Sequence, residues 1–367
     1  MSASTQPSLR LTLGPNLAPG TLIGGKYEVR RMIGRGGMGE VYEARYRRLS
    51  QRVALKLLSP LQRESVELRA RLEQEASAVA RLTSDHVVRV LDLLMTEDKT
   101  PVIVMEHLEG RDLELELAER RRLPLAEAVS WMLQACAALG EAHRCGIVHR
   151  DVKPSNLFLA ERDGRRTLKV LDFGISKDMS RGPTGLTTAT DRFGTSYYMS
   201  PEQIRDPRTV DTRSDVWSLG VIFYRMLTGR LPFEGETDSA VIAAVVMEEP
   251  KPIDDTIDPV PDLVRDAVMA TLQKARGERL QSVEELAQII RPYAAVGYEW
   301  SLPPSPIVSP SGHPDFSGAL TQFAPLSATS KRRLRRRLLG AGVLAAAESM
   351  GVGTWLLRSK PTVSAER

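Results

Sequence analysis

The stretch IVHRDVKPSNLFL, residues 147–159, decides the fold that we expect for this chain. It places a carboxylate, an ammonium group and an amide close together, at Asp151, Lys153 and Asn156. Asp151 can accept the proton of an attacking hydroxyl group, Lys153 can meet the charge of a moving phosphoryl group, and Asn156 can hold a divalent metal ion. For the HRD triplet alone, the competing interpretation is a structural turn with a solvated Asp–Lys pair. The pattern predicts a catalytic loop if the other parts of such a site follow.

A second metal ligand follows in LKVLDFG, residues 168–174. This apolar run predicts a strand that ends at Asp172, whose carboxylate would face the metal from the side opposite Asn156. The two motifs together favour phosphate chemistry over a structural turn.

A glycine-rich run, IGRGGMGEVYEARY, lies upstream at residues 33–46. Its Gly34, Gly36 and Gly39 have a spacing that dinucleotide-binding folds also use, so the glycines alone are weak evidence. Here a second strand follows the glycines instead of a helix. The run therefore predicts a hairpin whose backbone amides approach nucleotide phosphates closely.

These motifs resemble the eukaryotic-type protein kinases, in particular bacterial membrane-associated serine/threonine kinases, over residues 27–292. The resemblance implies an α+β, two-lobed kinase fold, with a β-rich N-lobe carrying one main helix (about 27–105) and a larger helical C-lobe (about 110–292). It implies transfer of the γ-phosphate of ATP to Ser or Thr hydroxyls of protein substrates, with Mg²⁺ or Mn²⁺, in bacterial signalling. A nucleotide-binding pseudokinase scaffold is the rival interpretation. The complete set of catalytic residue types argues against it.

Lys56 is a single cation within the apolar strand RVALKLL, residues 52–58. It would be costly to bury without a partner, although an edge-strand lysine facing water is an alternative. By resemblance, Lys56 holds the α and β phosphates and pairs with Glu75 on the next helix. Glu73 is a neighbouring candidate, but the pattern EQEASAVARL favours Glu75.

The nucleotide pocket is implied by the resemblance. VIVMEHLEG, residues 102–110, is similar to the hinge between lobes, with Met105 as gatekeeper, backbone hydrogen bonds to adenine from Glu106 and Leu108, and Asp112 near the ribose. Val41 and Ala54 from above and Phe158 from below would enclose the adenine. The full implied set is Gly34, Arg35, Gly36, Gly37, Met38, Gly39, Val41, Ala54, Lys56, Met105, Glu106, Leu108, Asp112 and Phe158.

Residues 172–202 are rich in Gly, Ser and Thr in their middle, which predicts a mobile activation loop. Arg150 beside Asp151 is a buried cation in need of an anion, and related kinases satisfy it with a loop phosphate. We therefore expect autophosphorylation at Thr187, with Thr188 and Thr190 as neighbouring sites. By resemblance, Thr195 braces Asp151 and Lys153, which favours Ser/Thr over Tyr substrates.

Three further residues have structural roles implied by the resemblance. Glu202 is expected to pair with Arg279 and so to anchor the substrate platform. Asp215 is expected to hold the catalytic-loop backbone from below, with surface helix capping as the alternative role.

Composition places the chain among ordinary globular proteins, with 42% hydrophobic and 26% charged residues. The two cysteines, Cys136 and Cys145, give no basis for a disulfide framework. Residues 1–26 are expected to be a disordered segment before the first strand at Tyr27, and they show no secretory signal. Residues 293–330 form a Pro/Ser-rich linker.

The C-terminal region combines a basic run, KRRLRRR at 331–337, with a twenty-residue apolar stretch at 338–357 and a short tail at 358–367. The apolar stretch is long enough to be a transmembrane helix, although Glu348 opposes insertion and a surface-lying amphipathic helix is the alternative. We expect single-pass anchoring in the inner cell membrane, with the kinase domain in the cytoplasm. A small-residue stripe indicates a homodimer through the kinase domain and this helix. No nucleic acid is expected, since the apolar stretch makes lipid the better partner for the basic run.

Overall fold

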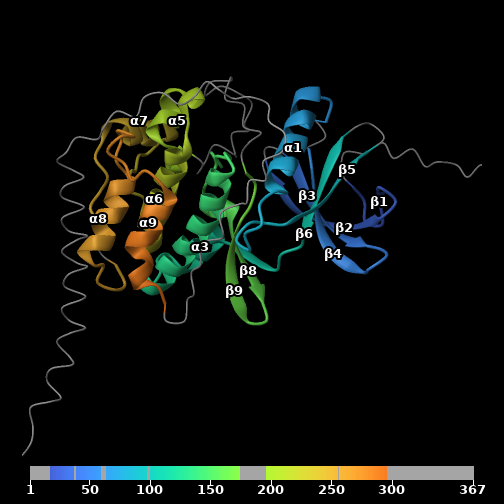
Figure 1. Cartoon of the computed structure of the whole chain (residues 1–367), viewed down its shortest axis with the longest axis horizontal. Coiled ribbons are helices and arrows are strands. Elements are labelled where there is room, and N and C mark those ends of the chain that lie inside the picture. Colours follow the sequence, from blue (N-terminus) through green and yellow to red (C-terminus); the bar gives the residue numbers. More distant parts are fainter. Residues whose placement is uncertain are drawn as a thin grey trace, which may run out of the picture. The chain divides into compact units, whose positions relative to one another are not determined.

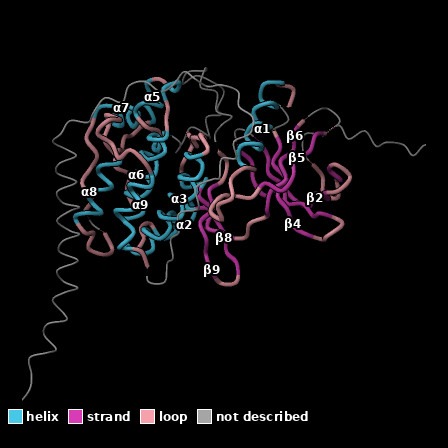
Figure 2. Tube along the Cα trace, viewed as in Figure 1, coloured by secondary structure: helices cyan, strands magenta, loops and turns pink. Residues whose placement is uncertain are grey.

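The computed structural model describes residues 17–36, 39–58, 63–96, 100–173, 196–254 and 256–295. Within these residues the strands gather in one lobe and most helices in the other (Figure 1). Figure 2 shows the same division by secondary structure, with the β8–β9 hairpin on the helical side. The predicted α+β, two-lobed arrangement is confirmed.

The N-lobe is a six-stranded antiparallel sheet with the strand order β1-β2-β3-β4-β6-β5. One helix, α1 (Val66–Val79), contacts β5 and β6. Ser65 begins α1 by accepting a hydrogen bond from the Leu68 amide. The strands are β1 (Leu22–Ile23), β2 (Tyr27–Gly36), β3 (Gly39–Tyr46), β4 (Gln51–Leu57), β5 (Val90–Met95) and β6 (Pro101–Glu106).

The folded N-lobe begins earlier than the sequence suggested. Strand β1 pairs with β2 before Tyr27, and Leu17 and Ile23 are buried in the core of the sheet. This apolar burial orders residues 17–26, although their local composition is typical of a loop. The expectation that disorder extends to residue 26 is therefore wrong for this part.

The C-lobe is built on two long buried helices, α3 (Leu125–Arg144) and α6 (Thr212–Thr228), which contact each other. Asp211 caps the start of α6, and Gly229 ends it in a left-handed conformation. The other helices are α2 (Leu113–Arg120), α5 (Pro201–Arg205), α7 (Asp238–Met247), α8 (Asp262–Thr271) and α9 (Val283–Ile290), with short 3₁₀ turns η1 (Pro154–Asn156), η3 (Ser196–Tyr198), η4 (Pro207–Thr209) and η5 (Arg291–Tyr293).

A small antiparallel sheet lies at the junction of the lobes. It consists of β7 (Gly110–Asp112), β8 (Leu157–Arg162) and β9 (Arg165–Val170). A parallel bridge joins Val87 to Val170, and the Val170 amide donates to the His86 carbonyl at 2.8 Å. The segment after α1 is thereby fixed to the C-lobe.

In the part of the chain that the structure describes, no helix combines the length and apolar character needed to cross a membrane. The expected span at 338–357 lies outside the described residues, as do the linker and the basic run.

Candidate active site

The catalytic-loop stretch is held from below by Asp215, on the first turn of α6. Asp215 Oδ2 accepts a hydrogen bond from the His149 amide and Oδ1 accepts one from the Arg150 amide, each at 2.9 Å. His143 Nε2 lies 2.8 Å from Oδ2. Burial raises the pKa of Asp215, but the bond to His143 and the neighbouring imidazoles outweigh it and leave the pKa below its ordinary value. The capping alternative does not apply, because Asp211 occupies the cap.

The three polar residues of the loop point toward one another. Lys153 Nζ lies 3.3 Å from Asp151 Oδ2. Asn156 Nδ2 donates to the Asp151 carbonyl at 2.8 Å and lies 3.3 Å from Oδ2. These contacts use the amide nitrogen of Asn156, which leaves its oxygen as the atom able to bind a metal ion.

Lys56 joins the two lobes at the site. Its Nζ donates to Glu75 Oε1 at 2.7 Å and to Asp172 Oδ1 at 3.0 Å. Burial alone would lower the pKa of Lys56, but the two carboxylates together raise it above its ordinary value. The ammonium group therefore stays charged at neutral pH. Glu73 is exposed and Glu75 is buried, so the structure brings Lys56 to the residue favoured by the sequence.

The glycine-rich hairpin is formed by β2 and β3. Gly36 lies opposite Gly39, and Arg35 lies opposite Glu40. A Cβ on Gly39 would lie only 2.1 Å from the Leu57 carbonyl oxygen, so only glycine permits this close approach of β3 to β4. Gly37 and Met38 lie outside the described residues.

The expected hinge connects β6 to β7. Glu106 is held through both its backbone and its side chain, because its amide donates to the Arg89 carbonyl at 3.0 Å and its carboxylate lies 2.8 Å from Lys169 Nζ. Its carbonyl and the backbone of Leu108 are the groups expected to meet adenine. Met105 lies opposite Ala54 in the β4–β6 register. The predicted gatekeeper and the residue expected above the adenine ring are therefore neighbours in the sheet.

The remaining expected nucleotide contacts come from three strands. Val41 on β3 lies opposite Lys56 on β4, and Phe158 on β8 lies opposite Asp112 on β7. Asp112 caps α2 by accepting a hydrogen bond from the Leu115 amide at 2.8 Å. Burial raises the pKa of this carboxyl group. Asp112 is therefore engaged by its helix as well as placed beside Phe158.

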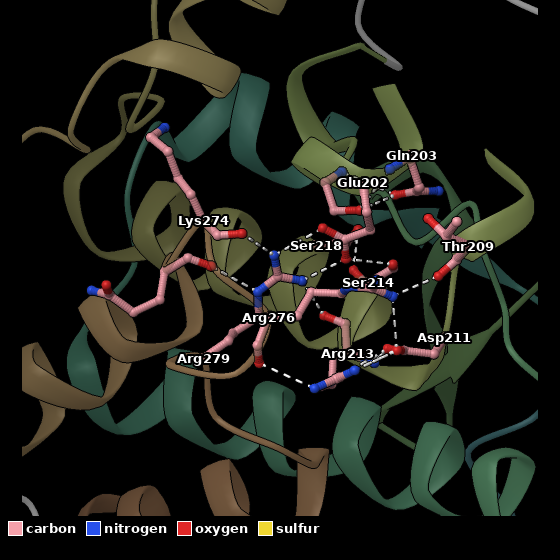
Figure 3. Close-up of polar contacts among 12 residues, drawn as sticks. Glu202, Gln203, Thr209, Asp211, Arg213, Ser214, Ser218, Lys274, Arg276 and Arg279 are labelled. Carbon is pink, nitrogen blue, oxygen red and sulfur yellow. Dashed lines mark hydrogen bonds and ion pairs between the residues drawn. The ribbon is translucent and has the colours of Figure 1, made fainter. Parts of the chain in front are cut away.

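A buried ion pair anchors the segment after the expected activation loop. Arg279 Nη1 and Nη2 donate to Glu202 Oε1 and Oε2 at 2.7 and 3.0 Å, and Ser214 Oγ donates to Oε1 at 2.7 Å. Figure 3 shows Arg279 at the centre of this cluster, with the Arg213 and Asp211 pair beside it. Burial raises the pKa of Glu202, but Arg279 outweighs this effect and lowers it. Arg279 also lies 5.0 Å above the Trp217 ring.

Helix α5, which begins at Pro201 after the expected activation loop, is joined directly to the catalytic loop. Gln203 Nε2 donates to the Arg150 carbonyl at 2.8 Å. Arg150 has a positive φ of 65°, and its Nε is buried without a hydrogen-bond partner among the described residues. Thr187, Thr188, Thr190 and Thr195 lie outside the part of the chain that the structure describes.

The chain matches the model of the protein kinase domain over residues 27–289. The chain belongs to the protein kinase family. A probable serine/threonine-protein kinase of Clostridium perfringens is 36% identical over 267 residues, covering 73% of this chain and 38% of that protein. The probable kinase PknB of Corynebacterium glutamicum is also 36% identical, over 273 residues, covering 72% of this chain and 42% of that protein.

A solved structure agrees with this assignment. The crystal structure of a point mutant of the Mycobacterium tuberculosis PknI kinase domain has a TM-score of 0.57 and 27% identity, and covers 76% of this chain and all of that one (100%). The chain spans about two fifths of the length of the curated kinases described above.

Several charged residues at this kinase site were missed from sequence. Lys169 secures the hinge through Glu106, and Glu141 on α3 accepts hydrogen bonds from the Thr83 amide and hydroxyl at 2.8 and 2.7 Å. Glu40, within the glycine-rich hairpin, is completely buried. The sequence signal for Lys169 and Glu141 was a single charged residue among apolar ones, as at Lys56. That signal predicts a buried ion pair or hydrogen bond, but it does not identify the distant residue that forms it.

Proposed function

We propose that this chain is an ATP-dependent serine/threonine protein kinase that transfers the γ-phosphate to protein Ser or Thr hydroxyl groups. The observation that carries the proposal is that Lys56 contacts both Glu75 and Asp172, together with a catalytic loop whose backbone Asp215 holds in place. The two named relatives are described as probable serine/threonine-protein kinases, which supports the substrate class.

Each side chain has a role that fits its contacts. Asp151 positions the substrate hydroxyl and takes its proton, while Lys153, 3.3 Å away, neutralises charge on the transferred group. Lys56 contacts the nucleotide phosphates, and Glu75 keeps its ammonium group directed into the site.

Asn156 and Asp172 would hold a divalent metal ion, Mg²⁺ or Mn²⁺. The donor set fits, because an amide oxygen and a carboxylate are hard oxygen ligands, and Mg²⁺ commonly takes few protein ligands when it shares substrate phosphates. Asp172 Oδ1 contacts Lys56, yet 47% of the Asp172 side chain is exposed, so the carboxylate remains accessible to a metal ion. When bound, the metal would supply charge neutralisation on the phosphate oxygens.

A radiolabel transfer assay tests the activity. The purified full chain is incubated with γ-labelled ATP, a divalent cation and a general protein substrate, beside Lys56→Met and a surface control, Lys251→Met. Label on Ser or Thr in the wild type and the control, with loss in Lys56→Met, supports the proposal. ATP binding without transfer by the wild type would instead support a pseudokinase scaffold.

We also propose that phosphorylation of the activation loop at Thr187, Thr188 or Thr190 regulates the enzyme. A cavity of about 420 Å³ lies between α1 and residues 145–150, and Arg150 lines it. A phosphate on the loop would satisfy the Arg150 guanidinium, whose Nε is buried. Phosphopeptide mapping of an active preparation tests this, and an active enzyme with an unmodified loop would refute it.

Membrane anchoring by residues 338–357 is a further proposal from sequence, with the kinase domain in the cytoplasm and pairing along Ala341, Ala345, Ser349 and Gly353. Alkaline carbonate extraction of membranes tests it, because a spanning helix stays with the lipid and a surface-bound helix is released. Ala345→Ile tests pairing, and unchanged self-association with unchanged loop phosphorylation would count against dimerisation.

A further inference from the structure

Glu40 is the first residue after Gly39, near the turn end of the glycine-rich hairpin, and it has no exposed surface (0%). Arg35 Nη2 donates to its Oε1 at 2.7 Å, and the Tyr42 hydroxyl donates to its Oε2 at 2.9 Å. Arg63 Nη2 lies 3.6 Å from Oε2. A carboxylate in this position is therefore surrounded by two cations and a hydroxyl group, as a buried charge requires.

The contact with Arg35 joins the two strands near the turn end of the hairpin. Arg35 and Glu40 lie opposite each other in the β2–β3 register, one step before the Gly36 and Gly39 pair. Cross-strand ion pairs stabilise the register of their strands. The Arg35–Glu40 pair therefore limits how far the two strands can separate where the tip begins.

The contact with Arg63 connects the hairpin to α1. Arg63 precedes Ser65, the cap of α1, and its Nε donates to the Leu58 carbonyl at 3.0 Å, just after β4. Strand β4 carries Lys56, and α1 carries Glu75. Glu40 thus connects the hairpin, of which it is part, to the segment that leads into the helix carrying Glu75.

The charges around Glu40 affect how well the hairpin can bind a triphosphate. A carboxylate within a phosphate-binding hairpin repels phosphates unless nearby cations neutralise it. Arg35 and Arg63 supply that neutralisation at Glu40. Removal of the carboxylate would release Arg35 from the opposite strand.

We infer that Glu40 is a positioning residue that holds the glycine-rich hairpin, through Arg35 and Arg63, in the conformation that receives the phosphates of the nucleotide. The inference assumes one part of the proposed function, that the chain binds ATP. It does not require that the chain transfers phosphate. Glu40 acts on the nucleotide through the hairpin backbone rather than by direct contact.

Calorimetric titration of the full chain with ATP and with adenosine tests the inference. Glu40→Gln keeps the shape of the side chain but removes its charge. Its Kd for ATP is expected to rise about tenfold, the order expected for a lost charged hydrogen bond, because loss of the hairpin conformation outweighs the added attraction between the two unneutralised arginines and the phosphates. The Kd for adenosine should change by less than about twofold, because adenosine lacks phosphates. Glu28→Gln, on β2, is the matched control with both affinities unchanged.

Arg35→Gln provides a second test that does not disturb a buried residue, because 58% of the Arg35 side chain is exposed. It should weaken ATP binding selectively, and the double variant should lose less binding free energy than the sum of the two single losses, because both remove the same contact. Equal losses for ATP and adenosine, or an unchanged ATP affinity in both variants, would overturn the inference. A wild type that binds ATP without transferring phosphate would refute only the proposed activity, whereas one that binds neither ligand would refute both.

Discussion

Lys56 Nζ donates to Glu75 Oε1 at 2.7 Å, and both side chains are buried. The contact joins strand β4 to helix α1, so the position of the helix decides whether the ammonium group faces the site. Because Lys56 also reaches Asp172 across the lobes at 3.0 Å, this one cation links the N-lobe to the expected metal-binding residue of the C-lobe.

Glu75→Gln is predicted to lower kcat by about tenfold to a hundredfold, since a misdirected cation loses part of its electrostatic stabilisation of the transferred group. Phosphate transfer at saturating ATP measures the effect. Glu73→Gln, exposed on the same helix, is the control and should retain wild-type turnover. The reverse result, with Glu73→Gln inactive and Glu75→Gln active, would show that the pair has been assigned to the wrong glutamate.

Asp215→Asn is predicted to destabilise the fold by about 2–3 kcal/mol at pH 7, because charged hydrogen bonds to two backbone amides become neutral ones. The folded-state pKa of Asp215 is lowered below its ordinary value, because the bond to His143 and the nearby imidazoles outweigh burial. Its contribution is therefore fully present above the unfolded-state pKa and is lost as the pH falls through the lower, folded-state pKa.

Denaturant unfolding at pH 7 and below about pH 4 checks this sign. The stability gap between wild type and Asp215→Asn should narrow in acid. A gap that widens as the pH falls would contradict the assignment of a lowered pKa to this carboxyl group.

Arg279→Met is predicted to cost about 3–5 kcal/mol, because it leaves the Glu202 carboxylate buried without its cation. Glu202→Gln combined with Arg279→Met should be less destabilised than the sum of the single variants. Thermal unfolding measures both. Arg208→Met, which breaks an exposed pair with Asp206, should change stability by less than about 1 kcal/mol. Equal losses for Arg208→Met and Arg279→Met would contradict this ranking.

Much of the site was predictable because its residues lie in short motifs with fixed local geometry. The catalytic loop, the strand before Asp172 and the glycine hairpin each combine a chemical group with a turn or strand signal. The family resemblance supplied pairs that are distant in sequence, such as Glu202 with Arg279.

Contacts without such a motif were not predictable. Glu141 reaches Thr83 across 58 residues, and Arg225 pairs with Glu114 across 111 residues. Strand β1 was missed although Gly24 and Gly25, both with positive φ, give a turn signal between it and β2, and the core of the sheet buries Ile23. The Glu141 and Arg225 contacts join residues far apart in sequence, and in β1 burial in the sheet core overrides a composition typical of a loop.

The most direct test of the central claim is single-turnover phosphate transfer by Asp151→Asn, compared with Asp163→Asn, an exposed carboxylate in the β8–β9 turn. With ATP affinity measured in parallel, Asp151→Asn should bind ATP like the wild type and transfer phosphate about 10²- to 10⁴-fold more slowly. Asp163→Asn should match the wild type in both. Transfer at the wild-type rate by Asp151→Asn would contradict the claim that this loop carries out the chemistry.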